Sequence, residues 1–199
     1  MLFFLMLFAM TRMSTADQAK VAAGMESAAV SRSAREEAGK DRLLQKRKEE
    51  DAVRGIQRAI SDGALAESAR VTVDDKTVKI TLNPTAFFTT GSATISEGTL
   101  RALNDLVEPI RAFPNDIIIE GHTVNMTVRG GAFRSNWELS VARAVSVINF
   151  FASKGLDARQ MIAGGYGEHH PAYPNDTEEN RAGNRRIEIT ILRQPGGNE

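Results

Sequence analysis

The hydrophobic and polar positions of the chain follow a two-residue period in three segments. Between Val71 and Leu82, apolar residues recur at every second position on both sides of an Asp-Asp-Lys turn, which is typical of a β-hairpin. Residues 186–191 alternate in the same way, as in a strand with one solvent-facing side. Residues 116–120 (DIIIE) form a continuous apolar run, typical of a strand covered on both faces. These segments predict the strands of a sheet.

Two other segments have a helical period. Residues 94–113 carry apolar side chains at helical spacing and precede Pro114, which is expected to stop the helix. Residues 135–153 form the second long helix, and Gly155 closes it. The order hairpin, helix, strand, helix, strand predicts an α/β fold (an α+β sandwich) with helices on one face of a mixed sheet. We assign the buried side of the second helix to its apolar positions, Trp137, Val141, Ala144, Val145, Ile148 and Phe151.

The N-terminal quarter follows neither pattern. Residues 1–10 are all apolar, but a helix of that length spans roughly 15 Å, about half of a hydrocarbon core of ~30 Å. The segment is either the second half of a membrane helix, a surface or partial anchor, or a cleaved signal. Residues 14–50 are polar and charged and are predicted to be a helical or disordered linker. Helical spacing of Val53, Ile56 and Ile60 places the start of the folded domain near residue 51.

Composition excludes several classes of function. The 199 residues have a formal net charge of zero, so no overall positive field indicates a nucleic-acid partner. The chain contains no cysteine, which excludes a disulfide framework and thiol catalysis.

The start of the second long helix carries the most suggestive polar residues. Ser135 and Glu138 have the spacing of a capping box, and capping alone accounts for this pair. Asn136, Ser140 and Arg143 share one helix face. A guanidinium flanked by an amide and a hydroxyl near a helix N-terminus suits a carboxylate ligand. An arginine on an amphipathic helix can equally be a surface charge, and the pattern alone leaves both interpretations open.

Catalytic and metal sites are not predicted. Adjacent histidines in Glu168-His169-His170 point to opposite sides of an extended chain, and no close third ligand follows. His122 lacks a nucleophile on an elbow and an oxyanion nest, so we expect it to tether its loop. The glycines of residues 164–167 lack the lysine of a phosphate loop and are interpreted as a backbone turn. We therefore predict no catalytic residue, no metal and no cofactor.

Four motifs in order resemble the OmpA-like peptidoglycan-binding domain: GHT, SNWELSVARA, GYGEHHP and NRAGNRRIEI. The wording of the second resembles the flagellar MotB-type members, and among them the lateral-flagellar stator type. Upstream, FFTTGSATISEGTLRAL resembles the opening of the same domain. The resemblance assigns residues 51–195 to this domain and residues 196–199 to a flexible tail.

The resemblance implies non-covalent binding of the diaminopimelate of a peptidoglycan stem peptide, with Arg143 pairing with its carboxylate. The implied binding residues are His122, Thr123, Val124, Asn125, Asn136, Ser140, Arg143 and Arg185. Of the neighbouring Arg185 and Arg186, one is expected to reach the pocket and the other to be surface charge. Val124 stands where the family carries an aspartate that faces the ammonium of the ligand. A charge-assisted hydrogen bond of about 1.5–3 kcal/mol would thereby be missing, and Asn125 would restore only part of it.

The same resemblance implies an organisation for the rest of the chain. Residues 1–13 would be a partial transmembrane helix and residues 14–50 a plug and linker, with a single pass through the inner membrane and the C-terminal domain in the periplasm. The expected partners are a multi-span MotA-like stator subunit and a second copy of the chain, as a homodimer. The ion-binding aspartate of such helices would precede Met1, so we expect anchoring without ion conduction. The alternative is an inactive stator remnant, or a general OmpA-like envelope protein without ion conduction.

Overall fold

The computed structural model describes residues 15–63, 65–83, 87–89, 91–126 and 132–193. The chain divides into two compact units, residues 1–47 and 48–199, and helix α2 (Thr15–Ser61) contributes to both. The predicted partial membrane helix at residues 1–13 and the predicted tail at 196–199 lie outside the described residues. Within the described part of the chain, no helix combines the length and hydrophobicity needed to cross a membrane.

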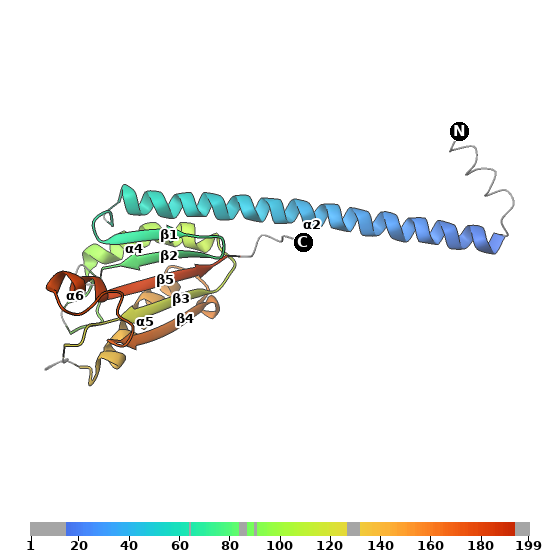
Figure 1. Ribbon diagram of the computed structural model, residues 1–199. Coiled ribbons are helices and arrows are strands. Elements are labelled where there is room, and N and C mark those ends of the chain that lie inside the picture. The colour runs from blue at the N-terminus through green and yellow to red at the C-terminus, as the bar shows by residue number, and fades with distance from the viewer. Residues whose placement is uncertain (1–14, 64, 84–86, 90, 127–131, 194–199) are drawn as a thin grey trace. The chain divides into compact units, whose positions relative to one another are not determined.

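A mixed sheet forms the centre of the second unit, as predicted, and it has five strands, one more than the sequence indicated (Figure 1). Its strand order is β1-β2-β5-β3-β4. Strands β3 and β4 run parallel, and the other neighbours are antiparallel. The bounds are β1 Ala69–Val73, β2 Thr77–Leu82, β3 Ile117–His122, β4 Met161–Gly167 and β5 Arg186–Leu192.

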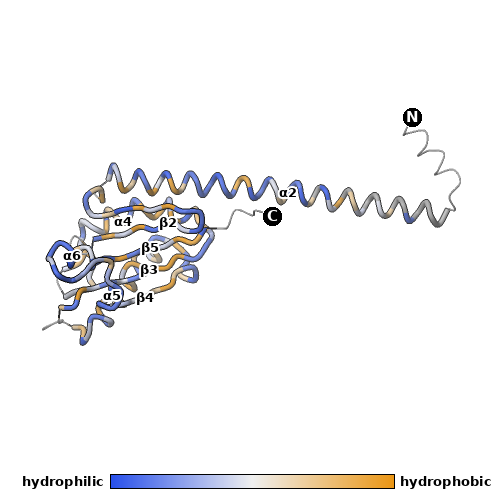
Figure 2. The backbone as a smooth tube through the Cα atoms, viewed as in Figure 1, coloured by the Kyte–Doolittle hydropathy of each residue, from blue (hydrophilic) through white to orange (hydrophobic). Residues whose placement is uncertain are grey.

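Helices α4 (Glu97–Arg111) and α5 (Asn136–Ser153) enclose the core together with the last turns of α2. Ile56 of α2, Leu103 of α4 and Phe151 of α5 are fully buried, as are the isoleucines of β5. Figure 2 shows hydrophobic residues concentrated in the strands and in α4 and α5, whereas α2 is mostly hydrophilic. The period-two and period-3.6 patterns therefore located the hairpin and both long helices. The second face of β3 is less covered than predicted, because Ile118 and Glu120 are partly exposed.

Strand β4 replaces the turn that the glycines of residues 164–167 predicted. Its glycines serve close packing: a Cβ atom on Gly165 would lie 2.6 Å from the amide nitrogen of Val141 and 2.7 Å from Oγ of Ser140. Only a residue without a side chain lets the backbone of α5 approach the strand so closely. The strand was not predicted from its composition, because glycine has a low β propensity and stands here to allow contact with a helix.

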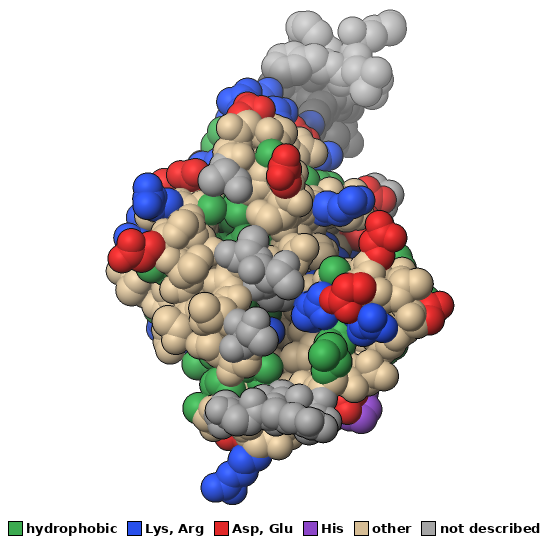
Figure 3. All heavy atoms as spheres, turned by 90° about the vertical axis from the view of Figure 1, so that its left-hand side faces the viewer, with side chains coloured by type: hydrophobic (Ala, Val, Ile, Leu, Met, Phe, Trp, Pro, Cys, Tyr) green, Lys and Arg blue, Asp and Glu red, His purple; other side chains and the backbone are tan. Residues whose placement is uncertain are grey.

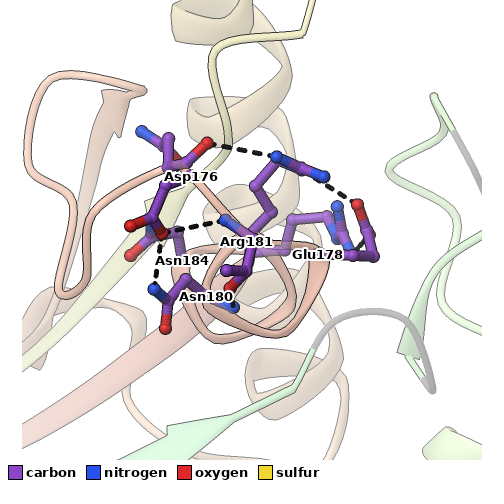
Figure 4. A network of polar contacts seen from close by, with 8 residues as sticks. Asp176, Glu178, Asn180, Arg181 and Asn184 are labelled. Carbon is purple, nitrogen blue, oxygen red and sulfur yellow. Dashed lines mark hydrogen bonds and ion pairs between the residues drawn. The ribbon is translucent and has the colours of Figure 1, made fainter.

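A short helix, α6 (Glu178–Asn184), was also not predicted; it begins after Thr177, whose side chain accepts a hydrogen bond from the Asn180 amide. Figure 4 shows the polar network around it. Asp176 accepts from the side chain of Asn180, and Arg181 forms an ion pair with Glu178 at 2.9 Å. The buried Asn184 holds the preceding loop through the amides of Ala172 and Tyr173. The network fixes the backbone that leads from β4 into β5.

Candidate functional site

The N-terminus of α5 is capped as predicted, with one difference. Oγ of Ser135 accepts a hydrogen bond from the amide of Glu138 at 3.2 Å. The carboxylate of Glu138 returns to the amide of Arg134 at 2.7 Å, rather than to that of Ser135. Two amides at the start of the helix thus have partners, which fixes where α5 begins.

The buried side of α5 differs from the prediction. Trp137, Val141 and Val145 are 50%, 40% and 39% exposed, whereas Ser140 and Arg143 are buried. The backbone of α5 packs closely on Gly121 and Gly165 at Ser140 and Val141, which places Ser140 on the buried side of the helix. Ala144 and Phe151 are buried as predicted, and Ile148 is partly buried. The helix therefore turns its arginine inward.

Arg143 is the central residue of the site. Its side chain is 6% exposed, its Nε donates to the carbonyl of Ser92 at 2.9 Å, and its guanidinium lies 5.0 Å from the ring centre of Phe88. No carboxylate of the described residues forms an ion pair with it. Burial, and then the charge of Arg185, lower the pKa of Arg143 to about 10, so the group remains cationic at neutral pH. A buried cation without an anion is suited to an anionic ligand.

Arg185 and Arg186 have different surroundings. Arg185 ends α6 and pairs with Glu178 at 2.6 Å, and its charge acts on Arg143. Arg186 was expected to be the surface charge if Arg185 faced the pocket, but it is buried and pairs with Glu188 at 2.6 Å. The counter-ion lies two positions along the same predicted strand, on the same face, so strand periodicity alone could have indicated this pair.

Asn136 ties the loop after β3 to the loop after β4. Its side-chain nitrogen lies 3.1 Å from the carbonyl oxygen of Val124, 3.0 Å from that of Met126 and 2.6 Å from a carboxylate oxygen of Glu168. The amide expected to contact a ligand therefore also holds the walls of the site together.

Ser140 is placed differently from the expectation. It is fully buried, its hydroxyl donates to the carbonyl of Trp137 at 2.8 Å, and it accepts from the amide of Gly167 at 3.1 Å. Both contacts are internal, so the hydroxyl joins α5 to β4 instead of flanking the guanidinium.

The predicted segment 122–125 lies where β3 ends. His122 is buried and stacks on Tyr166 of β4 with ring centres 5.2 Å apart. Burial, and then the charge of Arg186, lower the pKa of His122 to about 4, so the ring is neutral at pH 7. Thr123 and Val124 are buried, and Asn125 is exposed. Val124 brings no charge to the site.

A groove of about 1600 Å³ lies between α4 and α5, and neither Arg143 nor any other predicted binding residue is among the residues that line it. Ser92, which accepts from Arg143, and Ala142, its neighbour on α5, both line the groove. Apolar and polar side chains share its walls, among them Ile95, Leu100, Asn104, Val145, Asn149 and Phe150. Figure 3 looks onto the end of the unit that carries α6, where basic and acidic side chains are interspersed. The interspersed charges at the α6 end suit a ligand that carries both a positive and a negative group better than a polyanion.

Sequence reasoning missed three contributors: the carbonyl of Ser92, the ring of Phe88 and the carboxylate of Glu168. The first two lie in the stretch before α4, 51 or more positions from Arg143, so only the fold brings them together. Within the described residues, no three potential metal-binding side chains converge.

Comparison with known proteins adds independent findings. The model of the OmpA family matches residues 87–185, which include all the predicted binding residues. Motility protein B of Bacillus subtilis is 35% identical over 143 residues, covering 69% of this chain and 53% of that protein. The chain thus spans about half the length of this relative.

Three solved structures share the fold. A putative MotB-like protein from Desulfovibrio vulgaris has a TM-score of 0.65 at 26% identity, covering 76% of this chain and 99% of that chain. The cell wall anchor of the type VI secretion system from Pseudomonas aeruginosa has a TM-score of 0.64 at 27% identity, covering 69% and 96%. The periplasmic domain of Helicobacter pylori MotB (residues 97–256 of that protein) has a TM-score of 0.57 at 25% identity, covering 65% and 90%.

Proposed function

Because the chain carries an OmpA-like domain of the MotB family, we propose that it binds peptidoglycan without cleaving it and anchors a flagellar stator to the cell wall. The matched relatives include a motility protein and a cell wall anchor, which supports an anchoring role. In this proposal the domain lies in the periplasm, and the chain acts as a dimer beside a multi-span MotA-like subunit at the inner membrane.

The observation that carries the proposal is the buried guanidinium of Arg143, which forms no ion pair with any described residue. A stem peptide that ends in diaminopimelate presents a carboxylate, and Arg143 holds that carboxylate while the charge of Arg185 adds to the attraction. Ser92 and Phe88 fix the guanidinium through Nε and the ring face, so its orientation is set before the ligand arrives. The fixed geometry reduces the entropy lost on binding.

The experiment is co-sedimentation of the purified 199-residue chain with peptidoglycan sacculi. Arg143→Ala lowers the bound fraction, because the anionic group of the ligand loses its charged donor; a loss of about 1.5–3 kcal/mol corresponds to about tenfold or more in Kd. Arg159→Ala is the matched control, because Arg159 is an exposed arginine whose pair is local to Asp157. An unchanged bound fraction for Arg143→Ala overturns the proposal.

Val124 allows the opposite test. Its apolar side chain leaves the ammonium of the ligand without a charged partner at this position, so Val124→Asp raises the bound fraction of the chain on sacculi. If the aspartate variant folds and binds no better than the unaltered chain, residue 124 does not face the ligand.

A further inference from the structure

Val124 and Glu168 are neighbours at the ends of two parallel strands. The amide of Thr123 donates to the carbonyl of Gly167 at 2.8 Å, immediately after the paired residues of β3 and β4. Val124 and Glu168 are the next residues on their respective chains. Because parallel strands end at the same edge of a sheet, both side chains lie at the mouth where α5 begins.

Backbone geometry gives Glu168 its direction. The register of β3 and β4 shifts between Gly121 and His122, and Gly167 has φ of 54°, in the region that favours glycine. Such an irregularity re-aims the residue that follows. As a result, the carboxylate of Glu168 reaches the side-chain nitrogen of Asn136 at 2.6 Å, and the carbonyl of Val124 lies 3.1 Å from the same nitrogen. The carboxylate is therefore held beside residue 124.

Glu168 carries a negative charge that no basic side chain of the described chain neutralises. Two neighbouring carboxylates are engaged: Glu178 pairs with Arg181 and Arg185, and Asp176 accepts from the amide of Thr177 and the side chain of Asn180. Glu138 caps the helix through the amide of Arg134. Among the described residues, the printed partner of the Glu168 carboxylate is the neutral side chain of Asn136, so this carboxylate can also receive a cation.

We propose that Glu168 receives the ammonium group of the amino-acid end of the ligand, while Arg143 receives its carboxylate. The inference rests on the proposed function and names the acidic residue of the same site. Asn136 orients the carboxylate from the side of α5, so Glu168 supplies the charge that Val124 does not. The ligand is then recognised as a zwitterion by one residue after β4 and one residue within α5.

The test measures Kd of the full chain for a muramyl tripeptide that ends in meso-diaminopimelate, and for the same tripeptide with its free diaminopimelate amine acetylated. Glu168→Gln keeps an acceptor for Asn136 but removes the charge. It weakens binding of the free-amine tripeptide about tenfold and leaves binding of the acetylated form unchanged. Glu179→Gln is the matched control, because Glu179 is an exposed acid on α6. Val124→Asp placed in the Glu168→Gln chain restores at least part of the lost affinity.

The outcomes separate this inference from the proposed function. If Arg143→Ala weakens both tripeptides and Glu168→Gln weakens neither, Glu168 is not the ammonium partner and the wall-binding function stands. If Glu168→Gln weakens both tripeptides equally, the residue acts only by holding the loop, and the inference is wrong. If Arg143→Ala changes neither affinity, the proposed function fails.

Discussion

Two buried arginines of this domain differ in what surrounds them. Arg186 lies on the sheet with Glu188 at 2.6 Å, and Glu188 also pairs with Lys79 at 2.8 Å. Arg143 has a carbonyl and an aromatic ring, and no carboxylate among the described residues. Both residues are less than 9% exposed. Arg186 therefore has its counter-ion within the fold, whereas on the proposed function the anion that pairs with Arg143 comes from the ligand.

The largest effect on the difference between the two arginines is expected from a substitution of Glu188. Glu188→Ala leaves Arg186 buried without its anion, and removing one partner of a buried pair typically costs about 3–5 kcal/mol of unfolding free energy. Urea denaturation followed by circular dichroism measures the loss. Folded molecules of the variant still sediment with sacculi, because the Arg143 site is untouched. A variant of unchanged stability would show that the pair contributes nothing to the fold.

The buried His122 lies close enough to Arg186 for the arginine charge to lower its pKa, and the pH dependence of stability tests this effect. In the folded chain the pKa of His122 is lowered to about 4, so between pH 6.5 and about 4 the unfolded chain binds a proton that the folded chain does not. Stability attributable to this ring is fully present above pH 6.5 and is lost as the pH falls through that window, by about 3 kcal/mol at most. Unfolding curves of His122→Phe show a smaller decline over this range. An identical decline in both chains means that other groups cause it.

Substituting each arginine by methionine sharpens the comparison. Arg143→Met removes a buried cation that has no anion, so the free energy of unfolding stays constant or rises by about 1 kcal/mol while wall binding falls. Arg186→Met leaves the pair of Glu188 with Lys79 and lowers stability without weakening wall binding per folded molecule. Thermal unfolding measures the stability of both variants, and co-sedimentation with sacculi measures their wall binding. Equal losses of stability would mean that Arg143 is also structural.

Ser140 gives the smallest effect. Ser140→Ala leaves the amide of Gly167 without its acceptor and costs about 1 kcal/mol or somewhat more. The affinity of the folded variant for the stem tripeptide is unchanged, since the hydroxyl lies between α5 and β4. Isothermal titration calorimetry measures the Kd of the variant for the tripeptide. A tenfold weaker affinity would show that Ser140 contacts the ligand.

Much of the fold follows from periodicity. The hairpin, α4 and α5 were predictable because their apolar positions repeat at two or 3.6 residues. Strand β4 was not, since glycine at position 165 records the approach of α5 and not the preference of the strand itself. The inward side of α5 was misassigned for the same reason, because hydrophobicity ranks Trp137 above Ser140 and close packing reverses the order.

The site was predictable in part. Arg143 was identified from its helix position and from the resemblance to a wall-binding family. Its isolation from carboxylates was not visible, because the chain contains 25 acidic residues and the sequence does not say which of them meet which of the 25 basic ones. The nearness of Glu168 to Val124 depends on the parallel pairing of β3 with β4, which required the strand that composition concealed.

The most direct test follows the Nε–H resonance of Arg143 by nuclear magnetic resonance while a diaminopimelate-ending stem tripeptide is added to the chain. We expect a saturable shift of this resonance and no shift of the Arg186 resonance. The Arg143 shift is absent when the carboxylate at the free amino-acid end of the diaminopimelate is replaced by its amide. Binding of the tripeptide with no change at Arg143 would contradict it.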